Sequence, residues 1–254
     1  MIRNLLSALA FFLTLIPLAE AQGNTRYYDV ELIIFERNDT AAARTEFWPA
    51  VTQRPGTGMP LFNDDPGVDT SGFMPLGRGK QQFGGAYIAL ARSPAYTPIV
   101  HMAWRQPGLD AAHAVPVRIE AGQTFAVPNQ AAASAVPPND LGQNLALDST
   151  TPIAQASGLR QVEGTVKVVL GRYLHVYTDL ILRRPMPESF AGENRVPGIQ
   201  ATTDADGVGF RNLATTLHEF PMKQHRRMRS NEAHYLDHPM MGMIIIVRRA
   251  PGGA

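Results

Sequence analysis

The sequence predicts an α+β protein with a mainly antiparallel sheet, few helices and long irregular loops. Apolar residues alternate with polar ones, or run continuously, over several segments of strand length. Helical patterns do not regularly separate these segments, which argues against a doubly wound parallel fold. The chain also contains 22 Gly and 20 Pro in 254 residues, so a large share of it must form loops.

The N-terminal segment predicts an export signal rather than a structural element. Arg3 gives a positive start, and the apolar run Leu5–Leu18 has about 14 residues, fewer than the roughly 20 that span a bilayer. Ala19-Glu20-Ala21 fits a small-x-small cleavage site. We therefore predict a signal peptide over residues 1–21, cleaved near Ala21/Gln22, and a mature chain without a membrane span. An uncleaved membrane anchor is the alternative.

The first half of the mature chain contains three predicted strands and one helix. Tyr27–Arg37 is apolar on both faces in its middle, which predicts a central strand. Gly and Pro make Arg54–Lys80 irregular, whereas the apolar spacing of Phe83–Arg92 predicts a helix. Tyr96–Arg105 predicts a strand that leads into a turn, and Val115–Glu120 predicts a further short strand.

The segment Ala121–Gly158 has a different composition from the rest of the chain. It contains nine Ala and four Pro, no Lys or Arg, and a single aromatic residue, Phe125. Such a segment buries too little apolar surface to offset the entropy of ordering. We predict a flexible insertion at about residues 121–158 within a single domain that spans residues 22–254. A linker between two domains is the weaker alternative, because neither flank alone shows a full set of core elements.

The second half of the chain predicts three more strands. Val166–Leu182 alternates with a period of two, which predicts one long strand with a bend or bulge near Gly171, ended by Arg183-Arg184-Pro185. Leu217–Arg229 predicts a strand followed by a turn at Ser230-Asn231. Met243–Arg249 is apolar on both faces and predicts a strand inside the sheet.

Several classes of function are disfavoured by what the sequence lacks. The absence of Cys excludes disulfides, thiolate metal sites and cysteine nucleophiles. A net charge of +1 argues against a nucleic-acid partner bound through bulk charge. The sequence contains no phosphate loop, no G-x-S-x-G elbow, no H-E-x-x-H pair and no dinucleotide fingerprint. We therefore expect neither a cofactor nor an enzymatic activity of these common kinds.

One cluster of residues is compatible with a metal site. His234, Asp237 and His238 offer two imidazoles and a carboxylate, which are zinc ligands. The favoured interpretation is a turn in which Asp237 accepts backbone N–H groups and the histidines pack or pair. A metal site remains the alternative.

Two groups of residues are the candidate ligand-binding positions. The first, called the basic stripe, occupies alternate positions of one predicted strand and consists of Lys223, His225, Arg227 and Arg229. The stripe predicts an anion-binding surface, with a solvated or internally salt-bridged face as the alternative. The second, called the aromatic trio, also has a spacing of two and consists of Tyr173, His175 and Tyr177. These rings can stack on sugars, with ordinary cross-strand packing as the alternative.

Four stretches resemble one known family. They are YDVELIIFER (28–37), HMAWRQP (101–107), GRYLHVYTDL (171–180) and RRMRSNEAHYLDHP (226–239). Together these stretches resemble the CsiV family of periplasmic peptidoglycan-binding proteins of Gram-negative bacteria. The family pattern has Ser-Gly-Glu-Leu where this chain has Ser230-Asn231-Glu232-Ala233. Asn tolerates a left-handed turn nearly as well as Gly, so the turn itself is expected to persist.

The resemblance implies a role in cell-wall biogenesis and cell shape. It implies a periplasmic location and two partners, peptidoglycan and the outer-membrane lipoprotein that activates a bifunctional penicillin-binding protein. It implies no enzymatic activity, and no binding residue is transferred from the family to this chain. Two other functions compete with this one: a metal-dependent periplasmic hydrolase that uses His234, Asp237 and His238, and a structural adaptor that binds a protein partner but no glycan.

Overall fold

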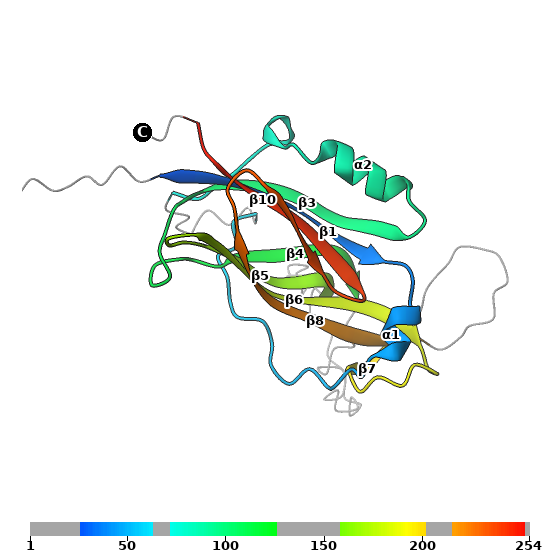
Figure 1. The fold of residues 1–254 in the computed structure, drawn as a ribbon. Coiled ribbons are helices and arrows are strands. Elements are labelled where there is room, and N and C mark those ends of the chain that lie inside the picture. The colour runs from blue at the N-terminus through cyan, green and yellow to red at the C-terminus, as the bar shows by residue number, and fades with distance from the viewer. Residues whose placement is uncertain (1–25, 63–71, 126–157, 202–214, 252–254) are drawn as a thin grey trace, which may run out of the picture.

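The computed structural model describes residues 26–62, 72–125, 158–201 and 215–251 (Figure 1). The predicted signal peptide and residues 126–157 of the predicted insertion lie outside these ranges. In chain order the described elements are β1 (Tyr27–Arg37), α1 (Ala41–Thr45), β2 (Met74–Pro75), the 3₁₀ helix η1 (Arg78–Lys80), α2 (Gly84–Arg92), β3 (Tyr96–Pro107), β4 (Val117–Phe125), β5 (Leu159–Leu170), β6 (Leu174–Pro187), β7 (Arg195–Ala201), β8 (Thr215–Met228), β9 (Ala233–Asp237) and β10 (Met241–Arg249).

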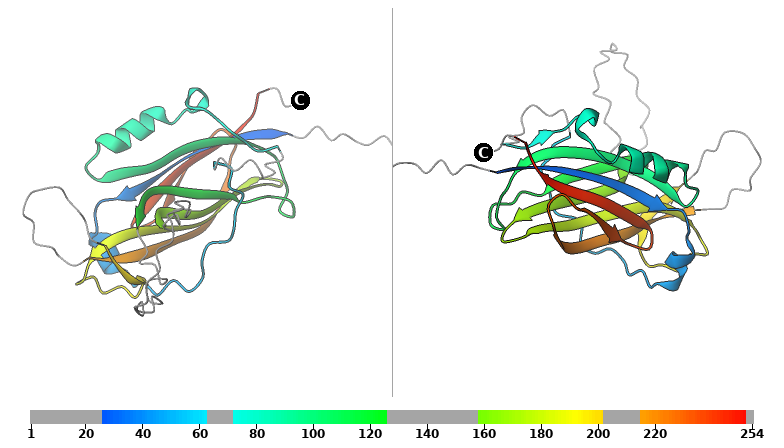
Figure 2. Two further views of the ribbon diagram at one scale, coloured as in Figure 1. Left: turned by 180° about the vertical axis from the view of Figure 1, so that it is seen from behind. Right: turned by 45° about the horizontal axis from the view of Figure 1, so that its top comes forward.

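The strands form two five-stranded antiparallel sheets that lie face to face (Figure 2). Sheet A has the order β2-β3-β1-β10-β9, and sheet B has the order β4-β5-β6-β8-β7. This arrangement confirms the predicted fold class, because the structure is mainly antiparallel sheet with few helices. No helix of the described residues is long and apolar enough to cross a membrane.

One continuous apolar core lies between the two sheets. Its side chains come from the inward faces of both sheets, as expected when strands alternate between core and solvent. The core includes Val30, Leu32 and Ile34 of β1, Ile245 and Val247 of β10, Val176, Leu180 and Leu182 of β6, and Phe220 and Met222 of β8. Described strands from both halves of the chain therefore contribute side chains to this core.

The prediction of one long strand over Val166–Leu182 is wrong. The structure has a hairpin, in which β5 and β6 pair and Leu170 lies opposite Leu174. The three residues between them turn the chain, and the Gly171 N–H donates to the Tyr173 carbonyl over 3.0 Å. An odd number of turn residues keeps even-numbered residues on the inward face of both strands. The period of two therefore continued through the turn and concealed it.

Other predicted elements are confirmed, some with different ends. β1 lies between β3 and β10, and β10 lies between β1 and β9, so both are internal strands. The turn after β8 places Asn231 at a φ of 65°, the left-handed region that the sequence predicts for it. β4 extends to Phe125, five residues into the segment for which we predict an insertion. β6 continues past Arg183-Arg184-Pro185, where we predict that the strand ends. Leu182 is the last residue of β6 that pairs with β5, and a proline beyond that point is tolerated because this pairing does not need its N–H.

Candidate functional site

The outward face of sheet B brings the two predicted groups of residues together. β6 and β8 are neighbours, with Tyr177 opposite His225 and His175 opposite Arg227. The basic stripe and the aromatic trio are about 50 residues apart in the chain, yet they form one surface. We call this surface, together with the neighbouring part of β5, the sheet B face.

Three rings on this face form a continuous stack. The rings of Tyr177 and His225 are nearly parallel, with centroids 4.3 Å apart and planes inclined by 12°. His225 and His175 stack next, with centroids 5.1 Å apart. His175 Nδ1 and His225 Nε2 lie 2.8 Å apart, so one of these nitrogens donates a hydrogen bond and the other accepts it. The stack fixes the orientation of side chains that face solvent.

Cations from two strands, β5 and β8, lie over the two tyrosine rings of this face. The Arg227 guanidinium carbon lies 4.6 Å from the centroid of the Tyr173 ring. Lys167 Nζ, from β5, lies 5.2 Å from the centroid of the Tyr177 ring. Both distances are within the range of a cation–π contact. Tyr173 is 44% exposed and Tyr177 is 38% exposed, so part of each ring remains accessible to a ligand.

Three members of the basic stripe have no acidic partner in the described part of the chain. Lys223, His225 and Arg227 are exposed, and none of them forms an ion pair there. Arg229 differs from them, because β8 ends at Met228 and Arg229 Nη1 lies 3.6 Å from Glu232 Oε1. Within the described residues the internally salt-bridged alternative therefore holds only at Arg229, whereas the exposure of the other three fits both an anion-binding face and a solvated one.

A cleft of about 430 Å³ opens beside the ring stack. Its floor includes Lys167, Tyr177, Asp179 and Lys223, and residues 56–57 form part of its wall. This volume lies within the range of small-molecule sites.

Backbone pairing holds the wall of the cleft against β4. The Met59 N–H donates to the Pro116 carbonyl, and the Arg118 N–H donates to the Met59 carbonyl, each over 2.8 Å. A Cβ atom on Gly58 would lie 2.8 Å from Thr165 Cγ2 and 2.9 Å from the Arg118 nitrogen. Only glycine allows this close approach, so Gly58 helps to set the width of the cleft.

Farther along the same strands, charged side chains are paired and buried. Arg183 is 1% exposed, and its Nε donates to Glu219 Oε1 over 2.8 Å. Its Nη1 donates to Glu163 Oε2 over 2.7 Å, and Arg54 also pairs with Glu219. The sheet B face therefore has a closed end with satisfied charges and an open end with unpaired ones.

The proposed metal ligands do not converge. Ala233–Asp237 is a strand, β9, and not the predicted turn. Alternation along an extended chain puts Asp237 on the face opposite to His234 and His238, and these two histidines lie about 13 Å apart at roughly 3.3 Å per residue. Within the described residues, no group of three or more His, Asp or Glu side chains is placed to hold a metal ion.

Each of these three residues has another partner. Asp237 Oδ1 accepts from Arg37 Nη1 over 2.9 Å and from the Tyr235 hydroxyl over 2.7 Å, and not from backbone N–H groups as predicted. His234 Nε2 accepts from the Arg229 N–H over 3.3 Å. His238 Nδ1 accepts from the Met240 N–H, and burial lowers the pKa of His238 to about 4. The prediction that the histidines pack or pair is confirmed.

Sequence reasoning missed two charged residues of the cleft, Lys167 and Asp179. Both occupy odd positions of the alternating segment, on the same face as Tyr177. Read as one strand, that segment would place Lys167 about 33 Å from Tyr177. The hairpin places these two residues directly opposite each other. Recognising Gly171-Arg172-Tyr173 as a turn would have found Lys167.

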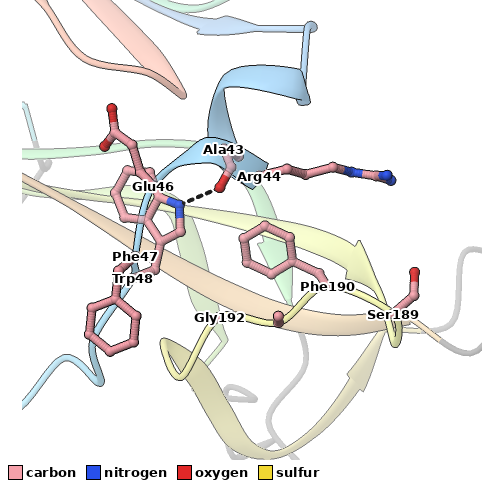
Figure 3. A pocket seen from close by; sticks show the side chains of 9 residues that line it. Ala43, Arg44, Glu46, Phe47, Trp48, Ser189, Phe190 and Gly192 are labelled. Carbon is pink, nitrogen blue, oxygen red and sulfur yellow. Dashed lines mark hydrogen bonds between the residues drawn. The ribbon is translucent and has the colours of Figure 1, made fainter.

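A second cavity, of about 370 Å³, lies near α1 (Figure 3). Trp48 Nε1 donates to the Ala43 carbonyl over 2.8 Å, and the Phe190 ring lies on the other side of the cavity. Phe47 is 73% exposed beside it. This cavity contains none of the residues predicted from the sequence as a site.

The comparisons with known proteins agree with the sequence resemblance. A family model described as "Peptidoglycan-binding protein, CsiV" matches residues 4–250, nearly the whole chain. No curated protein and no solved structure gives a significant match. The match over almost the full length shows that the chain belongs to the CsiV family of peptidoglycan-binding proteins.

Proposed function

We propose that the protein is a non-catalytic periplasmic protein that binds peptidoglycan during cell-wall assembly, and that the sheet B face is its binding surface. The observation that carries this proposal is the register of β6 and β8. It places three exposed cationic or imidazole side chains, Lys223, His225 and Arg227, beside the exposed Tyr173 and Tyr177.

The chemistry of this face matches the polymer. Peptidoglycan offers sugar rings, which stack on aromatic side chains, and stem-peptide carboxylates, which bind to Lys and Arg. Exposed charge contacts contribute on the order of 1 kcal/mol or less each. A polymer that presents the same groups repeatedly can still be retained, because several weak contacts act together.

Charge reversal on the sheet B face tests the proposal. We expect Lys223→Glu with Arg227→Glu to lower co-sedimentation with protein-free sacculi several-fold, since two anion contacts become repulsive. The matched control is Arg78→Glu with Arg92→Glu, which makes the same charge change at exposed positions of η1 and α2. Equal loss in both variants, or no loss in either, would contradict the assignment of the face. The same assay separates glycan binding from a purely structural adaptor, which sacculi alone would not retain.

The absence of catalysis is part of the proposal and has its own test. The residues of the alternative hydrolase are His234 and Asp237, on opposite sides of β9, and His238, which follows the strand; each has an internal partner. We expect purified protein to release no soluble fragments from sacculi, with or without added zinc. Release that depends on zinc and is lost in His238→Ala would support the hydrolase instead.

Export and the lipoprotein partner complete the proposed role. The composition of residues 1–21 supports cleavage near Ala21/Gln22, which N-terminal sequencing of periplasmic protein would check. The sequence resemblance implies an outer-membrane lipoprotein activator of a bifunctional penicillin-binding protein, which we propose as the partner. The exposed Phe47 lines the second cavity and not the cleft of the sheet B face, so Phe47→Ser tests whether that partner is held at a separate surface.

A further inference from the structure

Asp179 is the single carboxylate among the described residues that line the cleft on the sheet B face. In register it lies between Thr165 of β5 and Lys223 of β8. The next row of the sheet contains Lys167, Tyr177 and His225. The cleft therefore combines one negative group with two ammonium groups and an aromatic ring.

Asp179 and Lys223 are directly opposite each other but do not form an ion pair in the described structure. Four residues along the same two strands, Arg183 lies directly opposite Glu219, and these side chains pair over 2.8 Å and are buried. The two rows have the same backbone geometry and complementary charges. The difference is that Asp179 and Lys223 line an open cleft, where both charges remain available to a ligand.

We propose that this cleft binds an amino-acid zwitterion, a carbon atom that carries both a carboxylate and a free ammonium group. In a stem peptide whose third residue is a diamino dicarboxylic acid, the far end of that residue is such a group until its amine forms a cross-link. Asp179 accepts from the ammonium, Lys167 and Lys223 donate to the carboxylate, and Tyr177 covers the carbon chain. This inference rests on the proposed function and specifies its ligand.

The arrangement discriminates against cross-linked stems. A cross-link converts the ammonium into a neutral amide, which has one N–H and no charge. Asp179 then loses a charge-assisted hydrogen bond while remaining next to the ligand. Since Asp179 is half-buried, we expect a preference of about tenfold for the free ammonium. The protein thereby binds stems that retain the free amine, which are most frequent in newly made peptidoglycan, more tightly than stems that have used this amine in a cross-link.

Titration of the full-length mature protein with two soluble ligands tests this inference. The first is a disaccharide-tetrapeptide that contains the diamino acid with a free amine, and the second is the same compound after acetylation of that amine. We expect wild-type protein to bind the first about tenfold more tightly. Asp179→Asn should bind both equally, with an affinity close to that of wild type for the acetylated compound.

Glu232→Gln is the matched control, because it removes one exposed carboxylate outside the cleft and should retain the tenfold preference. Equal affinity of wild-type protein for the two compounds, or no binding of either, would overturn the inference. Failure of the proposed function gives a different result. In that case Lys223→Glu with Arg227→Glu would leave sacculus binding unchanged, whereas failure of the inference alone would leave that charge-reversal effect in place.

Discussion

The outward faces of the two sheets use similar residues in opposite ways. On sheet A, Glu31 is fully buried, and its carboxylate accepts from the backbone N–H groups of Gln82 and Phe83, just before α2. His101 Nε2 and Arg248 Nη2 also contact this carboxylate, at 2.9 and 3.3 Å. α2 covers this side of sheet A (Figure 1). The outward face of sheet A is therefore closed by its own chain.

On sheet B, the corresponding position is open. Asp179 is an outward carboxylate on a central strand, as Glu31 is, but no side chain in the described structure pairs with it. The neighbouring Lys223, Tyr177 and His225 are exposed, and Lys167 is half-buried. Both faces derive from the same alternation of residues, so the difference lies in what covers them. A polar row that the protein satisfies internally supports the fold, and a polar row left unpaired is available for binding.

The largest expected effect comes from removing the carboxylate of sheet A. Glu31→Ala leaves two backbone N–H groups and the Arg248 guanidinium without their buried acceptor. Breaking such a buried charge interaction costs about 3–5 kcal/mol. Urea unfolding should show this loss for Glu31→Ala, while Asp179→Ala should change the free energy of unfolding by about 0.5 kcal/mol or less. A similar loss in both variants would show that Asp179 supports the fold.

Buried histidines extend the comparison to the dependence of stability on pH. Burial lowers the pKa of His218 and of His238 to about 4, from 6.5. Between pH 6.5 and 4 the unfolded chain binds protons that the folded chain does not, so stability falls as the pH falls. Each histidine accounts for about 3 kcal/mol over this range.

A single variant isolates the contribution of one histidine to the pH dependence of stability. The destabilisation caused by His238→Gln, measured by urea unfolding, should shrink by about 3 kcal/mol between pH 6.5 and 4. Burial raises the pKa of Glu36, which titrates with the opposite sign, but both proteins share that group and the difference cancels it. A destabilisation that stays constant over this range would show that folding does not lower the pKa of His238.

Aromatic substitutions compare the two faces in binding. Tyr177 is 38% exposed on sheet B, and Tyr235 is 42% exposed on sheet A. We expect Tyr177→Ser to reduce sacculus co-sedimentation several-fold, because it removes a stacking surface worth about 1 kcal/mol. Tyr235→Ser should bind like wild type. The reverse order would move the binding surface to sheet A.

We expect the smallest effect from salt concentration, which tests the sheet B face as a whole. The screening length falls from about 10 Å at 0.1 M salt to about 3 Å at 1 M. Retention of wild-type protein on sacculi should therefore decrease between these concentrations. For Lys223→Glu with Arg227→Glu the decrease should be weaker, since the attractive charges are gone. A salt-independent wild type would indicate that stacking alone holds the polymer.

The sequence predicted most of the fold and about half of the site. Local apolar patterns predict the strands β1, β3, β8 and β10. The turn at Asn231 also follows from the sequence, because Asn tolerates a left-handed backbone conformation. The β5–β6 hairpin was missed because a three-residue turn preserves the period of two. The strand β9 was missed because its pairing with β10 is tertiary and the segment His234–His238 has no strand pattern of its own.

The sequence indicated the basic stripe and the aromatic trio as two separate groups, but it did not predict that they lie side by side. Pairing between β6 and β8 is a long-range contact that no local pattern specifies. Local patterns also do not place Lys167 beside Tyr177, because that contact depends on the β5–β6 hairpin. Nor do they place the segment around Gly58 at the wall of the cleft, because that segment is irregular in sequence. The sequence also did not predict which arginines form ion pairs. Arg183 and Arg227 have similar sequence contexts, but in the described structure only Arg183 pairs with acidic side chains.

Mapping of the bound ligand by NMR tests the central claim most directly. Isotopically labelled protein would be titrated with soluble un-cross-linked disaccharide-tetrapeptide, and shifts of the backbone amide and aromatic signals would be assigned. We expect the largest shifts on the outward side of β5, β6 and β8, at Lys167, Tyr177 and Lys223. Largest shifts around α2 and Tyr235, or around Phe47, would contradict the assignment of the sheet B face as the peptidoglycan-binding surface.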